Sequence, residues 1–92
     1  MIKTFRHKGL KQLFETGKSR VVSADLTRRA VRQLDLLNRA IQPSDMNLPS
    51  YRLHELKGEL KGTWSLTVSG NLRITFTFAG GDAYDVDLED YH

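Results

Sequence analysis

The second half of the chain alternates apolar and polar residues, and this pattern constrains the fold more than any other feature of the sequence. In the segments TWSLTVS, LRITFTF and DAYDVDLED, apolar residues recur at every second position. That period is typical of a β-strand with one face on a core and the other face open. Glycine-containing turns at 70–71 and 80–82 favour reversals between the segments. The predicted strands are 51–56, 62–69, 71–78 and 82–90, and in the last of them Tyr84, Val86 and Leu88 are predicted to face the core.

The first half of the chain has the helical period instead. In HKGLKQLFET, residues 7–16, apolar side chains recur on one face, and Gly17 is a common helix end. The segment ADLTRRAVRQLDLLNRAIQ, residues 24–42, follows Ser23, a favourable N-cap residue, and ends before Pro43. Its apolar stripe consists of Leu26, Ala30, Leu34, Leu37 and Ile41.

The order of these elements predicts an α+β fold. Two helices come first and a meander follows, so we expect two N-terminal helices packed on one face of a mainly antiparallel sheet. The opening segment IKTF is a candidate for one more short strand. With 92 residues and no repeat or long linker, we expect a single domain that spans residues 1–92.

The composition excludes several classes of protein. The absence of cysteine excludes disulfides, thiol nucleophiles and cysteine-ligated zinc, and it fits a reducing compartment. No apolar run approaches the roughly 20 residues that a membrane span needs. Basic residues also interrupt residues 1–16 too often for a secretory signal. We therefore expect a cytoplasmic protein that makes no membrane contact.

The net charge of +3 hides an uneven distribution. All 14 lysines and arginines lie before Gly81, whereas five of the 11 acidic residues follow it. Residues 1–81 therefore carry a net charge of +8 and the last eleven residues carry −5. A body this basic attracts polyanions, of which nucleic acid is the commonest in the cytosol. A solvated basic surface without a partner is the simpler interpretation of the charge alone.

Reactive side chains fall on or near the open face of the predicted sheet. The alternation turns Arg73 away from the core, and His54 has the parity opposite to Leu53. If the strands pair in sequence order, the start of strand 71–78 lies beside the end of strand 82–90. Arg73 then lies near the chain end, while the approach of His54 and Lys57 depends on a register that the pattern leaves open. The candidate site residues are His54, Lys57, Arg73, Asp90, Tyr91 and His92.

This set of side chains suits the cleavage of a phosphodiester in RNA. A base must remove the proton of the 2′-hydroxyl group, and an acid must protonate the departing 5′-oxygen. Imidazole titrates near neutrality and serves in either role. Negative charge grows on the phosphate between them, and fixed arginine or lysine side chains stabilise it. Taken singly, each residue also has a structural explanation, so the argument for function is a joint one.

Three segments of the chain together resemble a known protein family. They are MIKTFRHKGLKQLFETGK, RLHELKGELKGTWSLTVSGNLRITF and the ending DAYDVDLEDYH. The combination is similar to the HigB-like branch of the RelE/ParE toxin superfamily. The resemblance implies a RelE-like, microbial-RNase-like α+β fold and a ribosome-dependent endonuclease that cuts messenger RNA in the decoding site of the small subunit. It further implies a helix-turn-helix, HigA-like antitoxin as partner. We expect no cofactor and no metal.

The family motifs also imply roles for the candidate residues. The motif RLHELKG supplies His54 and Lys57, NLRITF supplies Arg73, and the ending supplies Asp90, Tyr91 and His92. The resemblance assigns the two histidines to proton transfer or substrate positioning and the two cations to the phosphate. Asp90 and Tyr91 are assigned to orientation and RNA contact. Which group is base and which is acid stays open.

Three other interpretations stay open as well. A ParE-like toxin would share the fold but inhibit DNA gyrase as a binder, although such relatives lack the catalytic set. A non-catalytic RNA-binding module would use the basic face, with Tyr91 as its main stacking residue. A metal site of His54, His92 and Asp90 would have the two-histidine, one-carboxylate composition. Insensitivity of cleavage to EDTA, with ribosomes that retain magnesium, would remove this last interpretation.

Overall fold

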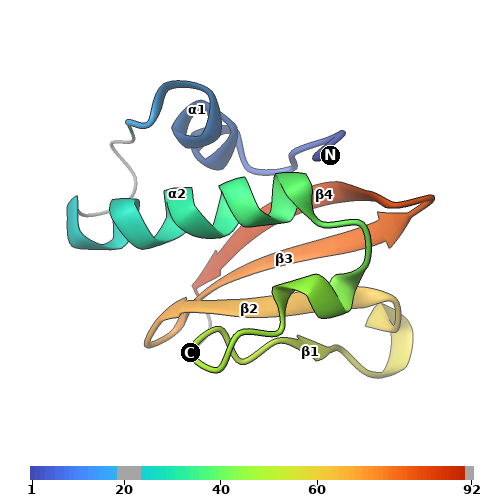
Figure 1. Ribbon diagram of the computed structural model, residues 1–92. Coiled ribbons are helices and arrows are strands. Elements are labelled where there is room, and N and C mark those ends of the chain that lie inside the picture. Colours follow the sequence, from blue (N-terminus) through green and yellow to red (C-terminus); the bar gives the residue numbers. More distant parts are fainter. Residues whose placement is uncertain (19–23, 91–92) are drawn as a thin grey trace.

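The computed structural model describes residues 1–18 and 24–90, so Ser23, Tyr91 and His92 lie outside the described part. Two helices come first and a four-stranded antiparallel sheet of order β1-β2-β3-β4 follows. Both helices lie on the same side of the sheet (Figure 1). The predicted α+β architecture is therefore confirmed. The elements are α1 (Lys8–Thr16), α2 (Ala24–Arg39), η1 (Pro43–Met46), β1 (His54–Glu55), η2 (Gly58–Leu60), β2 (Thr63–Ser69), β3 (Leu72–Ala79) and β4 (Asp82–Asp90).

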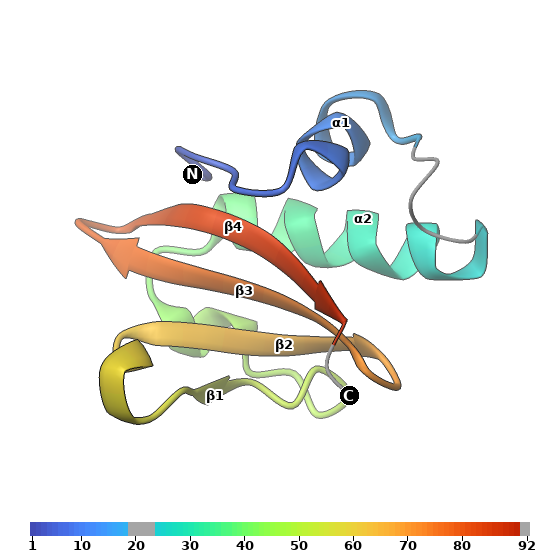
Figure 2. The same ribbon diagram turned by 180° about the vertical axis from the view of Figure 1, so that it is seen from behind.

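The segment before α1 lies along the outer edge of β4, as Figure 2 shows from behind. Ile2 bridges Ala83 and Phe5 bridges Val86, both in parallel orientation. The amide of Lys3 donates to the carbonyl of Ala83 at 2.8 Å. The strand expected at IKTF is thus present as two bridges, and it covers the edge of β4 that would otherwise offer unpaired backbone groups.

The core lies between the helices and one face of the sheet. α2 contributes Ala30, Leu34 and Leu37, which are fully buried, and α1 contributes Leu10 and Leu13. These side chains meet the apolar parity of the strands, as the period-two pattern requires. Within the described residues, no helix is long and apolar enough to cross a membrane. The sheet side of the core includes Leu66, Val68, Ile74, Phe76, Ala83 and Val86.

α2 ends at Arg39, earlier than the predicted end at residue 42. The reason is the 3-10 helix η1, which begins at Pro43 and whose Asp45 carboxylate accepts the amides of Ile41 at 2.9 Å and Gln42 at 3.3 Å. The bond from Ile41, followed by that from Gln42, holds the pKa of Asp45 below its usual value. Because the chain leaves the helix here, the Ile41 side chain is 72% exposed, and its assignment to the apolar stripe is wrong.

A bulge in β4 overturns part of the predicted alternation. Thr75 lies opposite Asp87 but Thr77 lies opposite Tyr84, so β4 contains one more residue than β3 over this stretch. Asp85, inside the bulge, has a φ of 54°. The extra residue turns Tyr84 onto the face of Thr77, while Ala83 and Val86 are buried. The prediction that Tyr84 and Val86 share the core face is therefore wrong.

The first predicted strand, 51–56, is reduced to the two residues of β1. Arg52 adopts a φ of 50°, a left-handed conformation that interrupts an extended strand. Tyr51 nevertheless stays in the core, 4% exposed, and its carbonyl accepts the amide of Thr67 at 2.8 Å. The Arg52 turn therefore separates a buried anchor from the short strand that carries His54.

Two alanine substitutions test the end of α2. Leu37→Ala should lower the free energy of unfolding by about 2–5 kcal/mol, because it leaves a cavity in the core. Ile41→Ala should cost less than about 0.5 kcal/mol, because this side chain is largely in solvent. Urea unfolding of both variants measures the difference. Equal losses would contradict the exposed position of Ile41.

Candidate functional site

A row of four polar side chains crosses the sheet on the face opposite the helices. Residues directly opposite each other in an antiparallel pair share a face. His54 of β1 lies opposite Ser65 of β2, Ser65 lies opposite Thr75 of β3, and Thr75 lies opposite Asp87 of β4. The side chains of Ser65 and Thr75 are nearly covered, whereas that of His54 is exposed. The histidine therefore lies at one end of a continuous polar row.

Arg73 belongs to the neighbouring row on the same face. Its partners are Thr67 on β2 and Glu89 on β4. His54 and Arg73 are thus two strands and one row apart, or roughly 12 Å between Cα atoms in an ideal sheet. Both side chains are long enough to reach a group held between them. The structure therefore confirms that Arg73 points away from the core and places His54 on the same face.

The hydrogen bond of His54 defines how its ring is oriented. Nδ1 lies 3.2 Å from the carbonyl oxygen of Arg52, two residues earlier. Arg52 itself has the left-handed φ of 50° that interrupts the strand. A carbonyl oxygen only accepts, so the ring nitrogen donates in this bond. The turn at Arg52 was not evident in the sequence, because arginine is not a residue type that marks a positive φ.

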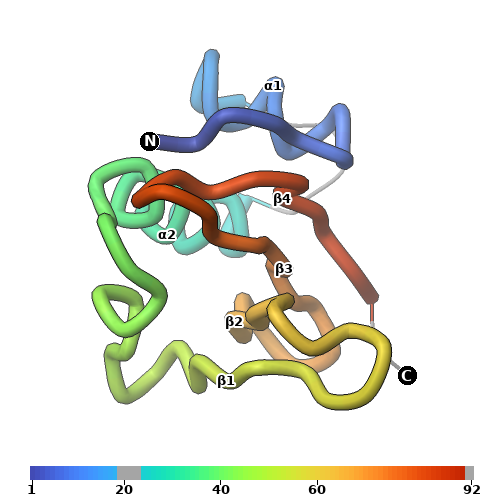
Figure 3. Tube along the Cα trace, turned by 90° about the vertical axis from the view of Figure 1, so that its right-hand side faces the viewer, coloured from blue at the N-terminus to red at the C-terminus, as the bar shows by residue number. Residues whose placement is uncertain are grey.

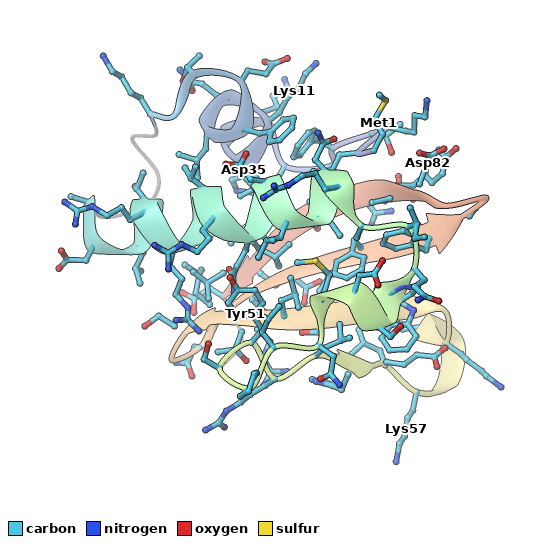
Figure 4. The ribbon with its side chains drawn as sticks, viewed as in Figure 1. Met1, Lys11, Asp35, Tyr51, Lys57 and Asp82 are labelled. Atoms are coloured by element: carbon cyan, nitrogen blue, oxygen red, sulfur yellow. The ribbon has the colours of Figure 1, made fainter. Side chains whose placement is uncertain are left out.

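Lys57 lies away from Arg73. It is the residue before η2, and the backbone of the adjacent Leu56 pairs with Thr63 at the start of β2. Arg73 lies at the other end of the sheet, where β3 begins. Figure 4 shows the Lys57 side chain extending from the lower rim of the molecule. The structure therefore does not place Lys57 in one cluster with Arg73.

Asp90 is the last residue of β4 and lies opposite Leu72, so it has the parity of the core face, whereas its neighbour Glu89 shares the open face with Arg73. The Asp90 side chain is exposed. Tyr91 and His92 follow it directly in sequence and lie outside the described residues. The structure thus brings the start of β3 and the end of β4 together, as the strand order predicted.

A hollow of about 170 Å³ lies on the same face, toward the end of the sheet that Lys57 occupies. Its lining combines threonine hydroxyl groups with apolar and charged residues that reach the face from both edges of the sheet. Figure 3 shows the face bounded by β4 above and by the loop after β1 below. The lining residues are Arg6, Leu56, Leu60, Thr63, Thr75, Phe76, Thr77, Asp85 and Glu89.

Several residues of this face were not among the candidates. Glu89 lies opposite Arg73 on β4. Tyr84 joins the face through the bulge, and Arg6 reaches it from the segment that lies beside β4. The parity of Glu89 could have been recognised from the strand pattern. The bulge that turns Tyr84 has no comparable signal in the sequence.

The described residues do not form a metal site. Among residues 1–18 and 24–90, no three histidine or acidic side chains are placed to hold a metal ion. The set considered above includes His92, which lies outside this part of the chain. What the described geometry does offer is an imidazole and a guanidinium on one polar face, which suits proton transfer beside an anionic group.

Comparison with known proteins identifies the family of the chain. Residues 3–92 match the family described as the RelE-like toxin of type II toxin-antitoxin system HigB. The chain is 48% identical to Endoribonuclease HigB of Proteus vulgaris over 92 residues, which is all of both chains. It is 31% identical over 87 residues to Toxin HigB-1 of Vibrio cholerae, with 92% of each chain covered.

The fold has a solved counterpart in a crystal structure of a YafQ mutant from E. coli. The two share 14% sequence identity and superpose with a TM-score of 0.57, over 98% of this chain and 93% of that one. This likeness concerns the fold alone. The family match over nearly the whole sequence, together with the two HigB relatives, carries the assignment: the chain belongs to the HigB-like family of RelE-like toxins from type II toxin-antitoxin systems.

Proposed function

We propose that this toxin is a ribosome-dependent endoribonuclease that cuts messenger RNA in the decoding site and so inhibits translation. Membership of the HigB-like family and the name of the Proteus vulgaris relative support RNA cleavage. The observation that carries the proposal is the placement of His54 and Arg73 on one open face of a basic domain. The 2′-hydroxyl group of the message attacks the adjacent phosphorus and displaces the 5′-oxygen.

His54 acts as the base that removes the proton of the 2′-hydroxyl group. Because Nδ1–H donates a hydrogen bond to the Arg52 carbonyl, the neutral ring has its free electron pair on Nε2. The ring edge that carries Nε2 is therefore the one that accepts the proton. The fixed carbonyl also stabilises the imidazolium that forms, since both nitrogens then donate.

Arg73 stabilises the negative charge that develops on the phosphate. It lies one row from the His54–Thr75 row, so the message crosses the sheet between the two side chains. A guanidinium offers two parallel donors to phosphate oxygens and keeps its charge at every physiological pH. Lys57 has a different role in this arrangement, because it lies toward the opposite end of the sheet. It contacts a phosphate farther along the message.

The chain end supplies the acid. Asp90 ends β4 beside the start of β3, the strand that carries Arg73. His92 protonates the departing 5′-oxygen, and Asp90 and Tyr91 orient the RNA. Two imidazoles of opposite protonation state are the simplest pair for a concerted proton transfer near neutral pH. The site needs no cofactor or metal.

The ribosome and its bound message are the partners of the active toxin. A helix-turn-helix antitoxin of the HigA type neutralises it, as the toxin-antitoxin family implies. Translation places the site of action in the cytoplasm. The charge of the chain fits an RNA partner, since residues 1–81 carry the full set of 14 basic side chains.

The tautomers of two histidines test the geometry of the base. Neutral His54 should carry its proton on Nδ1, whereas neutral His7 should carry it on Nε2, because His7 Nδ1 accepts the amide of Leu10 at 3.0 Å. Long-range ¹H–¹⁵N correlation spectra distinguish the two forms. A proton on Nε2 of neutral His54 would contradict its assignment as base.

Replacement of His54 tests the catalytic role directly. His54→Ala should lower the rate of message cleavage on programmed ribosomes by about 10²–10⁴-fold, the usual contribution of a general base, without loss of ribosome binding. His7→Asn is the control, because asparagine preserves the N-cap of α1 and removes a histidine of no catalytic role. Full activity of His54→Ala would refute the role of His54. Intact messages with the unmodified protein, together with DNA breaks in cells, would favour gyrase inhibition instead.

Removal of the last two residues tests the acid. A chain truncated after Asp90 should bind programmed ribosomes but cut the message at least about 10²-fold more slowly. Single-turnover cleavage and a parallel binding assay separate the two effects. Restoring the terminus with asparagine in place of His92 should not recover the rate, because an amide does not transfer a proton. Equal cleavage by the truncated and complete chains would place the acid elsewhere on the sheet.

A further inference from the structure

Two adjoining hollows lie where α2 passes over the loop before β1. The first has a volume of about 350 Å³ and the second about 420 Å³, and both are lined by Arg29 and Ser50. Arg28 and Arg32 of α2 line the first hollow, and Arg52 lines the second. We refer to Arg28, Arg29, Arg32 and Arg52 as the arginine surface.

Arg29, which joins the two hollows, is held in place by the protein. Its terminal nitrogen donates to the carbonyl of Ser50 at 2.8 Å, and its guanidinium carbon lies 5.5 Å from the centre of the Tyr51 ring. The Nε atom is buried and has no hydrogen-bond partner among the described residues. An unsatisfied buried donor is costly, and a bound ion or water is one explanation for it. Figure 4 shows Tyr51 below α2.

The positive charge of the arginine surface is not balanced within the described residues. Asp25 is the one carboxylate that lines either hollow. No carboxylate of residues 1–18 or 24–90 lies within 4.0 Å of Arg28, Arg29, Arg32 or Arg52, for the salt bridge found there joins the Met1 amino group to Asp82. Arg28 and Arg32 are four residues apart on one helix, a spacing at which like charges repel. A bound anion would remove this repulsion.

The arginine surface leads to the catalytic face. The backbone carbonyl of Arg52 holds the His54 ring, so the last arginine adjoins the first catalytic side chain. The second hollow also includes Thr67, which lies opposite Arg73, and extends to Gly70 in the β2–β3 turn. In Figure 1 this turn and the first half of α2 lie on the same side of the molecule. The second hollow therefore extends from Arg29 of α2 and Arg52 to the strand position opposite Arg73.

We infer that the arginine surface binds phosphate groups of an RNA backbone and holds the toxin in place while the catalytic face cuts. Planar guanidinium groups recognise phosphate oxygens through paired hydrogen bonds. The RNA is either the message beyond the cut phosphodiester or ribosomal RNA beside it, and the phosphate chemistry is common to both. The choice of RNA rests on the proposed function, but binding is measured without cleavage.

The test compares two doubly substituted chains, each made in the His54→Ala background so that RNA stays intact. Arg28→Gln with Arg32→Gln removes two charges from the arginine surface. Lys11→Gln with Arg39→Gln removes two charges from exposed positions outside both hollows. Dissociation constants are measured against potassium chloride concentration for a short unstructured RNA and for message-free ribosomes. All four side chains are exposed, so the core is unchanged.

Loss of two phosphate contacts should reduce the slope of log affinity against log salt by about 1.4–1.8 and weaken binding about tenfold or more. The control chain should keep the slope of its parent. A loss confined to the short RNA identifies the message, and a loss confined to ribosomes identifies ribosomal RNA. Equal slopes for both substituted chains would overturn the inference.

The same experiment distinguishes binding of a protein partner and failure of the nuclease proposal from failure of the inference about RNA. Unchanged RNA binding by the Arg28→Gln, Arg32→Gln chain, with loss of binding to the purified antitoxin, would overturn the inference in favour of a protein partner. If the unsubstituted toxin cuts no message but the salt slopes differ as expected, the nuclease proposal fails and the arginine surface is supported.

Discussion

The register of the antiparallel sheet is the constraint on which the rest of the structure depends. Because side chains alternate between faces, a slip of one residue would move Ile74 out of the core and Arg73 into it. The pairing of Leu66 with Ile74 fixes the core face, and the pairing of Ser65 with Thr75 fixes the polar face in the same step. Burial of the apolar face therefore also decides on which face His54 and Arg73 lie, with no separate interaction needed to turn them away from the core.

The parity of most strand residues and the position of the core were predictable from the sequence, because both follow from apolar periodicity. Arg73 could be assigned to the open face for this reason alone. Tyr84 could not be placed correctly, because the bulge depends on a positive φ at Asp85. Aspartate tolerates a positive φ, but its presence in a sequence does not predict one. Ile41 was misplaced for a related reason. Its backbone bonds to Asp45, a local contact that competes with one more helical turn.

The relative positions of the candidate site residues were harder to predict from the sequence than the fold. His54 was recognised as a reactive residue, but the direction of its ring depends on the Arg52 carbonyl, a backbone detail that no periodicity encodes. Lys57 and Arg73 were both recognised as cations, yet the register places them toward opposite ends of the sheet. Residue types can therefore be identified from sequence when their chemistry is distinctive. Their mutual distances depend on turns and bulges, which have weak signals.

α2 combines stability and binding because the two requirements lie on different faces of the helix. Truncation of a buried leucine such as Leu34 or Leu37 to alanine lowers the free energy of unfolding by about 2–5 kcal/mol. Repulsion between Arg28 and Arg32 costs only about 0.2–0.5 kcal/mol. The stabilisation from the buried leucines is therefore several times larger than the repulsion between the arginines, and the helix forms without any ligand. The uncompensated charge persists in the folded toxin and is available to an anion, which removes the repulsion without disturbing the core.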